Sequence, residues 1–199
     1  MKTCISMLLC AFFVNAKAFA FSSEINWRHT ITESKIEGKK FTLKMKAQAE
    51  NEVCEALTME NVTNSYLRFM DRQAKIQSKT VSGTNFDLDY TLKDKNNNLP
   101  WRTTGHYTAK DMVTISETKP MVLSGLAASL KKLHTLIKIN KEVGKMKILV
   151  DQTFEFEVPG YLPDATFKSL ATKGAVDGFK ENLDRTFDPI AQDLSLICQ

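Results

Sequence analysis

The residue types best suited to acid-base chemistry gather in one stretch, from Trp101-Arg102 to His106-Tyr107. On one strand this stretch could present a cation, a base and aromatic rings to a substrate. The other two histidines, His29 and His134, have no metal-ligand spacing with His106, and the chain has no HExxH motif, paired CxxC or glycine-rich phosphate loop. We therefore expect no metal and no cofactor, and we keep Arg102 and His106 as the residues of an enzymatic alternative.

The N-terminus has the order of features of a cleavable secretory signal peptide over residues 1–20. Lys2 is followed by an apolar run from Ile5 to Val14 and by Ala18-Phe19-Ala20, the small-x-small pattern of a cleavage site. The run is shorter than the roughly 20 apolar residues of a membrane-spanning helix, so a retained anchor is the weaker interpretation. A cut after Ala18 and lipidation of Cys10 also stay open. The pattern predicts export from a bacterial cytoplasm, to the periplasm or outside the cell.

Composition after cleavage predicts one domain over residues 21–199 that does not bind nucleic acid. The chain has 27 basic and 23 acidic residues, and loss of Lys2 and Lys17 lowers the net charge from +4 to +2. The charges are interspersed and no stretch reads as a linker. Of the four cysteines only Cys54 and Cys198 remain. An oxidising compartment favours a disulfide between them, and two buried thiols are the alternative.

Alternating apolar and polar residues predict an antiparallel sheet in the first two thirds of the chain. A strand over Phe41–Ala49 is followed by a helical stretch from Glu52 to Met70, which Asn51 would cap. This stretch forms either one helix or two short ones. Turns are expected at Gly83-Thr84-Asn85 and Lys110-Asp111, and a loop over Lys93–Pro100. The remaining strands are predicted at Ala74–Val81, Phe86–Leu92, Arg102–Thr108 and Met112–Glu117.

The last third predicts a long strand and a long helix. Residues 121–136 fit a helix or a strand, with a division near Lys131, and an apolar row from Met146 to Val158 predicts the long strand. Gln152 falls in that inward row, so it either has a local hydrogen-bond partner or faces a space that is not purely apolar. Asp164 is expected to cap a helix that runs to about Phe187, with Pro189 bending or restarting it.

Gly174 and Gly178 are unusual inside the predicted C-terminal helix, because glycine costs about 1 kcal/mol relative to alanine there. Two explanations are open: close packing of the helix onto the sheet, or room for a ligand.

This order of elements resembles the START-like superfamily, also called SRPBCC, from about Phe41 to Ala191. The most specific stretch is Phe154-Glu155-Phe156-Glu157-Val158-Pro159-Gly160-Tyr161-Leu162-Pro163 leading into Phe167-Lys168-Ser169-Leu170, which looks like the last strand, turn and final helix of that family. The resemblance implies an α+β helix-grip fold: a curved antiparallel sheet around a long C-terminal helix, with a short helical pair after the first strand. The long stretch 120–132 and the residues 21–40 depart from it.

The resemblance also implies a disulfide and a cavity. The helical pair would bring Cys54 to Cys198, and an apolar cavity between sheet and helix would take a lipid or another hydrophobic small molecule. Core residues would then line it, with Gln152 orienting the ligand; the set is Phe86, Leu88, Tyr90, Gln152, Phe154, Phe156, Gly174 and Gly178. We expect a non-enzymatic binder or carrier. The alternatives are an enzyme acting on an apolar substrate, and an envelope interaction module in which Met121–Lys132 docks on a partner or on a membrane surface.

Overall fold

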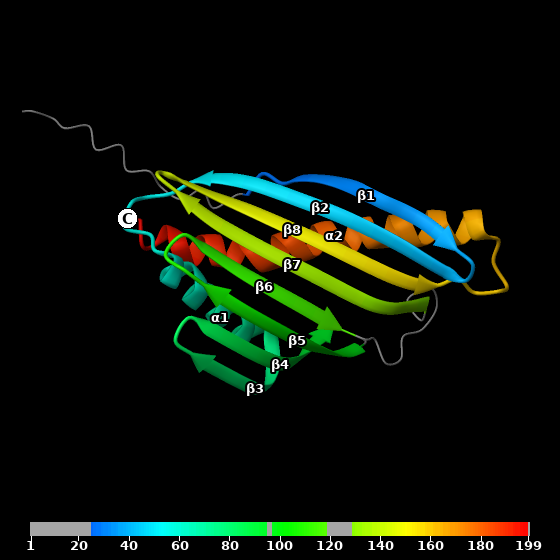
Figure 1. The fold of residues 1–199 in the computed structure, drawn as a ribbon, viewed down its shortest axis with the longest axis horizontal. Coiled ribbons are helices and arrows are strands. Elements are labelled where there is room, and N and C mark those ends of the chain that lie inside the picture. Colours follow the sequence, from blue (N-terminus) through cyan, green and yellow to red (C-terminus); the bar gives the residue numbers. More distant parts are fainter. Residues whose placement is uncertain (1–24, 95–96, 119–128, 199) are drawn as a thin grey trace, which may run out of the picture.

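One curved antiparallel sheet wraps around two helices in the computed structural model, which describes residues 25–94, 97–118 and 129–198 (Figure 1). The strand order is β1-β2-β8-β7-β6-β5-β4-β3, and every neighbouring pair is antiparallel. The bounds are β1 Arg28–Glu37, β2 Lys40–Glu52, β3 Ala74–Ser82, β4 Asn85–Asp94, β5 Asn97–Tyr107, β6 Asp111–Thr118, β7 Leu130–Glu142 and β8 Lys145–Glu157, with helices α1 Met59–Gln73 and α2 Asp164–Ser195.

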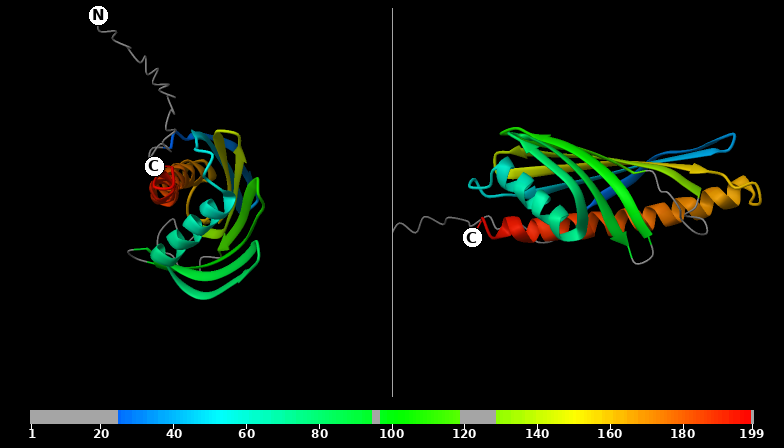
Figure 2. Two further views of the ribbon diagram at one scale, coloured as in Figure 1. Left: turned by 90° about the vertical axis from the view of Figure 1, so that its left-hand side faces the viewer. Right: turned by 90° about the horizontal axis from the view of Figure 1, so that it is seen from below.

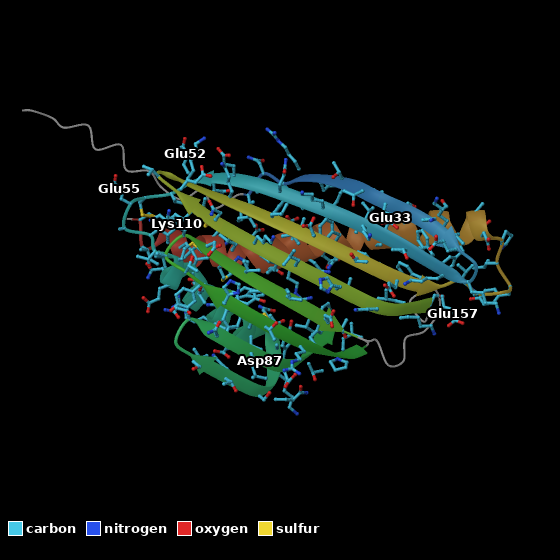
Figure 3. All side chains as sticks on the ribbon, viewed as in Figure 1. Glu33, Glu52, Glu55, Asp87, Lys110 and Glu157 are labelled. Carbon is cyan, nitrogen blue, oxygen red and sulfur yellow. A yellow bond between two sulfur atoms is a disulfide. The ribbon has the colours of Figure 1, made fainter. Side chains whose placement is uncertain are left out.

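Both helices lie on the concave side of the sheet (Figure 2). Inward residues alternate with outward ones along each strand, so Phe41, Leu43 and Met45 of β2 are buried while Lys40 and Lys44 are exposed. Charged side chains such as Glu33, Asp87 and Glu157 cover the face turned away from α2 (Figure 3). One apolar core therefore lies between the sheet and the helices.

The predicted α+β fold and most of the strands are confirmed. Gly83, in the expected turn, and Gly144, between β7 and β8, have positive φ, 58° and 71°, which glycine adopts without steric cost. Two features of the sheet differ from the prediction. β1 was not expected, because its residues are mostly exposed and show no alternation. The predicted loop Lys93–Pro100 is largely strand, since β4 and β5 stay paired up to Asp94 and Asn97.

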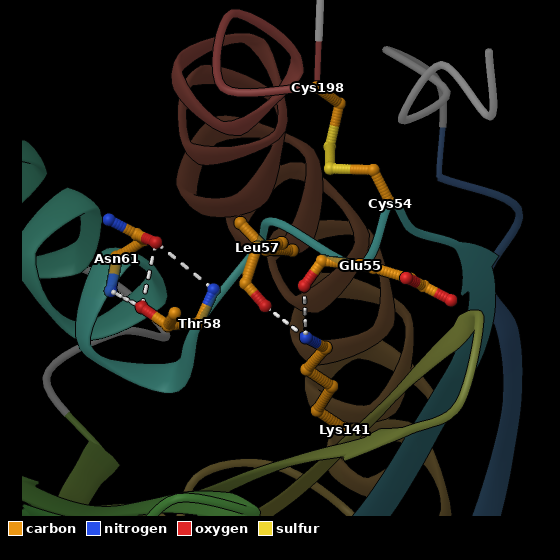
Figure 4. Close-up of a disulfide and its surroundings, with 7 residues drawn as sticks. All are labelled: Cys54, Glu55, Leu57, Thr58, Asn61, Lys141 and Cys198. Atoms are coloured by element: carbon orange, nitrogen blue, oxygen red, sulfur yellow. Dashed lines mark hydrogen bonds between the residues drawn. A yellow bond between two sulfur atoms is a disulfide. The ribbon is translucent and has the colours of Figure 1, made fainter.

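The helical pair predicted after the first strand is wrong, because the described chain there contains the single helix α1. β2 continues to Glu52, so Asn51 lies in a strand and caps nothing. The cap is Thr58: its hydroxyl accepts from the Asn61 N–H at 3.1 Å, and the Asn61 side chain accepts from the Thr58 N–H at 3.0 Å (Figure 4). This capping box satisfies two backbone donors at the helix start.

The long C-terminal helix is confirmed, with two corrections to its ends. Pro163 is the N-cap and Asp164 is the first helical residue, without a side-chain cap. The helix neither stops at Phe187 nor restarts at Pro189 but continues to Ser195. Pro189 has no N–H to donate to the carbonyl of Arg185. Burial of Phe187, Ile190 and Leu194 holds the helix on both sides of this missing bond.

Cys54 and Cys198 form a disulfide that ties the end of α2 to the segment between β2 and α1 (Figure 4). Their Cα atoms are 5.6 Å apart and 144 positions apart in sequence. In the chain-entropy model a loop of that length corresponds to about 5 kcal/mol of stabilisation. The same segment is held by Lys141, whose ammonium donates to the carbonyl oxygens of Glu55 and Leu57. This end of the helix is therefore fixed covalently and by hydrogen bonds.

Residues 1–20 and 121–128, which are the predicted signal peptide and the first half of the ambiguous segment, lie outside the described residues. From Leu130 onward that segment belongs to β7. Within the described residues, neither helix is long and apolar enough to cross a membrane.

Candidate functional site

A cavity of about 270 Å³ lies between the sheet and the two helices. Its apolar wall comes from three elements that converge on the concave side: Phe69 and Met70 of α1, Phe179, Leu183 and Phe187 of α2, and Leu133, Ile137 and Val150 of the sheet. All of these side chains are buried because each lies on the inward face of its element. The volume is just below the usual range for ligand pockets, which begins at about 300 Å³, so the cavity fits a compact ligand.

Polar residues occupy both the mouth and the interior of the cavity. Gln73, Asn182 and Arg185 are exposed and form a polar mouth between the end of α1 and the middle of α2. Ser116, Thr135 and Gln152 lie inside, on β6, β7 and β8. Arg185 is the only charged side chain among the described residues that line the cavity. A ligand passing the mouth would therefore meet neutral groups only.

Two buried tyrosines show that the interior is a poor environment for charge. Burial raises the pKa of the Tyr66 phenol, and the neighbouring hydroxyls of Ser116, Thr114 and Thr103 only partly oppose that rise. Burial also raises the pKa of Tyr90, and the adjacent Tyr66 adds to the shift. Both phenols line the cavity and stay neutral at physiological pH, so they act as hydrogen-bonding groups and not as bases.

Among the predicted site residues, only Tyr90 and Gln152 line the cavity. Phe154 and Phe156 stack with ring centroids 6.0 Å apart and, like Phe86 and Leu88, belong to the packed core beside it. Gly174 is exposed and Gly178 is half-buried, and a Cβ at either position would meet nothing within 4 Å. The two glycines thus neither bring α2 close to the sheet nor make room for a ligand.

Arg102 and His106 do not reach the cavity. Both alternate with the inward residues Trp101, Thr103 and Gly105 and point outward from β5. The Arg102 guanidinium donates to Asp87 Oδ2 at 2.7 Å across the outer face. The enzymatic alternative required these two side chains to converge inside the cavity, and the structure places them on the opposite side of the sheet. In the described chain, no group of three or more His, Cys, Asp or Glu side chains could hold a metal ion.

Sequence reasoning missed the neighbours of Gln152. Thr103, Ser116 and Thr135 are polar residues at inward positions of three neighbouring strands. A polar residue at an inward position is the signal that identified Gln152. Threonine is common in strands for steric reasons, so each occurrence alone indicates little. Their meaning depends on cross-strand register, which only the folded sheet fixes.

Comparisons with known proteins found similar solved structures. No family model and no curated protein matches the sequence. Among solved structures, a protein from Thermus thermophilus is similar over 75% of this chain and 96% of its own, with 11% identity and a TM-score of 0.47. Norcoclaurine synthase from Thalictrum flavum is similar over 79% and 96%, with 11% identity and a TM-score of 0.43.

A START superfamily protein from Mycobacterium smegmatis is similar over 76% of this chain and 97% of its own, with 15% identity and a TM-score of 0.39. The chain has the helix-grip fold. The eight-strand order and the long helix in the concave face of the sheet are the arrangement that the START-like resemblance implied. At these identities and TM-scores the matches say nothing about ligand or activity.

Proposed function

We propose that this protein is a non-enzymatic binder or carrier of a compact hydrophobic molecule, held in the cavity between the sheet, α1 and α2. The observation that carries the proposal is a cavity of about 270 Å³ whose walls are mainly aliphatic and aromatic and whose one charged side chain, Arg185, stands at the mouth. Burial of apolar ligand surface would supply most of the binding energy. The polar mouth gives a ligand a route in from water.

The test is binding of an apolar fluorescent probe, N-phenyl-1-naphthylamine, to two variants with the same change. Val150 lines the cavity and is 3% exposed, whereas Val158 is 6% exposed and lies outside it. We expect Val150→Phe to weaken probe binding at least tenfold, because the larger ring fills the space. Val158→Phe should bind the probe like the wild type.

Thermal unfolding of both variants identifies any loss of binding that comes from unfolding. Native mass spectrometry of protein purified from its own host should also show a bound apolar molecule that Val150→Phe lacks. Equal probe affinity in all three folded proteins, or no probe binding by the wild type, would remove the proposal.

We also propose that the protein works outside the cytoplasm, after removal of residues 1–20. The signal-like order of residues at the N-terminus supports this, together with a disulfide between the two cysteines that cleavage would leave. The mass of the protein purified from its host should correspond to a chain that begins at Phe21 and has no free thiol. A chain that retains Met1 would contradict export by this route.

A further inference from the structure

A row of polar side chains crosses the inner face of the sheet at one level. Thr103 of β5 lies opposite Ser116 of β6, Ser116 opposite Thr135 of β7, and Thr135 opposite Gln152 of β8. The row ends at apolar residues on both sides, Leu88 of β4 and Met45 of β2. Directly opposite residues of antiparallel strands share a face, so the four polar groups form a continuous band, the polar row, on a wall that is otherwise largely apolar.

The polar row forms two separate hydrogen-bonded groups. On one side, the Tyr90 hydroxyl lies 3.0 Å from Thr103 Oγ1, which lies 2.6 Å from Ser116 Oγ. On the other side, Gln152 Nε2 donates to Thr135 Oγ1 at 2.9 Å. Among the described residues no hydrogen bond joins Ser116 to Thr135, although they are opposite each other and both line the cavity. The gap between the two groups is thus at the cavity wall.

One strong acceptor in the polar row has no partner. Gln152 is 5% exposed, and its Oε1 makes no hydrogen bond in the described chain. A buried amide oxygen without a partner costs about 1–3 kcal/mol, so buried acceptors are normally paired with a donor. Gln152 lines the cavity, so a ligand bound there could supply the donor. The donor must be neutral, because no described residue inside the cavity carries a balancing charge and both neighbouring phenols stay un-ionised.

We propose, building on the proposed function, that the ligand is a compact alcohol whose hydroxyl group is bound at the gap in the polar row. The hydroxyl donates to Gln152 Oε1 and accepts from the hydroxyl of Ser116 or Thr135. The apolar body of the ligand lies against Phe179, Leu183 and Val150. A hydroxyl fits this place better than a carbonyl group, which only accepts, and better than a carboxylate or ammonium group, which would bring an unpaired charge into an apolar space.

The test uses three rigid probes of nearly equal size: adamantane, 2-adamantanol and 2-adamantanone. Their dissociation constants are obtained by displacement of N-phenyl-1-naphthylamine from the full mature chain, in the wild type and in Gln152→Met. Methionine keeps the length of the side chain and removes its amide. We expect Gln152→Met to weaken binding of 2-adamantanol about 3- to 10-fold, the usual effect of one hydrogen bond, and to leave adamantane unchanged or bound more tightly.

Ile137→Met is the matched control, since Ile137 lines the same wall without a polar group. It should change the affinities for all three probes by the same factor. An equal loss for adamantane and 2-adamantanol in Gln152→Met would overturn the inference and reduce Gln152 to a wall residue. A larger loss for 2-adamantanone than for 2-adamantanol would also overturn it, because the free amide group would then be a donor. If the wild type binds none of the probes, including the fluorescent one, the proposed function itself fails.

Discussion

Two parts of the α2–sheet interface are built in different ways. Near the start of α2, Phe167 packs edge-on against Phe41 and Phe156, with ring centroids 6.1 and 6.2 Å apart, and all three side chains are buried. Further along the helix, Phe179 and Leu183 face the cavity and the polar row. The first part fills its space with aromatic rings, whereas the second leaves a mainly apolar space with a few hydroxyl groups on its wall. The same helix therefore provides rigidity at one place and a binding site at another.

The largest expected effect compares two phenylalanines of α2 across these parts. Phe167 is 0% exposed and Phe179 is 2% exposed, but only Phe179 lines the cavity. Phe167→Ala should lower the free energy of unfolding by about 3–5 kcal/mol, because it empties a filled aromatic cluster. Phe179→Ala should cost less by at least about 1 kcal/mol, because that ring already lacks contacts on one side.

Urea unfolding of both variants measures the difference between these two costs. Equal costs, or a larger cost for Phe179→Ala, would mean that the two parts of the interface are packed alike.

A smaller effect is expected from a substitution at Gly105. This residue lies two positions from Thr103 on β5, outside the cavity. A Cβ on Gly105 would lie 2.0 Å from Cζ of Phe86, so the ring would have to move. Gly105→Ala should destabilise the protein by about 1–3 kcal/mol. Gly174→Ala is the control: its Cβ would meet nothing, so it should stabilise α2 by about 0.5–1 kcal/mol. A Gly105→Ala variant as stable as the wild type would show that the Phe86 ring can move aside at little cost in free energy.

The smallest effect concerns pH and tests how dry the polar row is. Because burial raises the pKa of Tyr90 above its unfolded value of about 10, folding favours the neutral phenol. This contribution is fully present below pH 10 and is lost as the pH rises toward the folded-state pKa. The free energy of unfolding should fall less steeply above pH 10 in Tyr90→Phe than in the wild type. Chemical unfolding between about pH 8 and 11.5 measures both slopes, and identical slopes would mean that water reaches this phenol.

The sequence predicted the fold well where local patterns and packing agree. The apolar row from Met146 to Val158 is continuous, since β8 must bury every second residue to cover α2. The structure has a single strand there, Lys145–Glu157. Thr58 is the N-cap of α1. Asn51 was an equally good local candidate, but its strand β2 pairs with β8, so it lies in the sheet. Pro189 locally indicates a break, and tertiary burial on either side of it overrides that indication.

The candidate site was less predictable, because it depends on which strands become neighbours. Gln152 was identified as a polar residue in an apolar row, and the structure places it at the cavity. Thr103, Ser116 and Thr135 come from three other strands, and nothing local to them says that they align with Gln152. Gly174 and Gly178 failed as indicators because small residues mark a cavity only when they face inward, and these two do not.

By itself, the sequence determined the alternation of the strands, the long final helix, the cysteine pair and the signal-like N-terminus. These follow from periodicity and residue chemistry over short distances. Only the tertiary structure decided that a polar row crosses the inner wall from Leu88 to Met45, that Arg102 and His106 face outward, and that Gln152 keeps a free acceptor beside a cavity. Cross-strand register and helix position set these features, and both are properties of the whole fold that no single segment encodes.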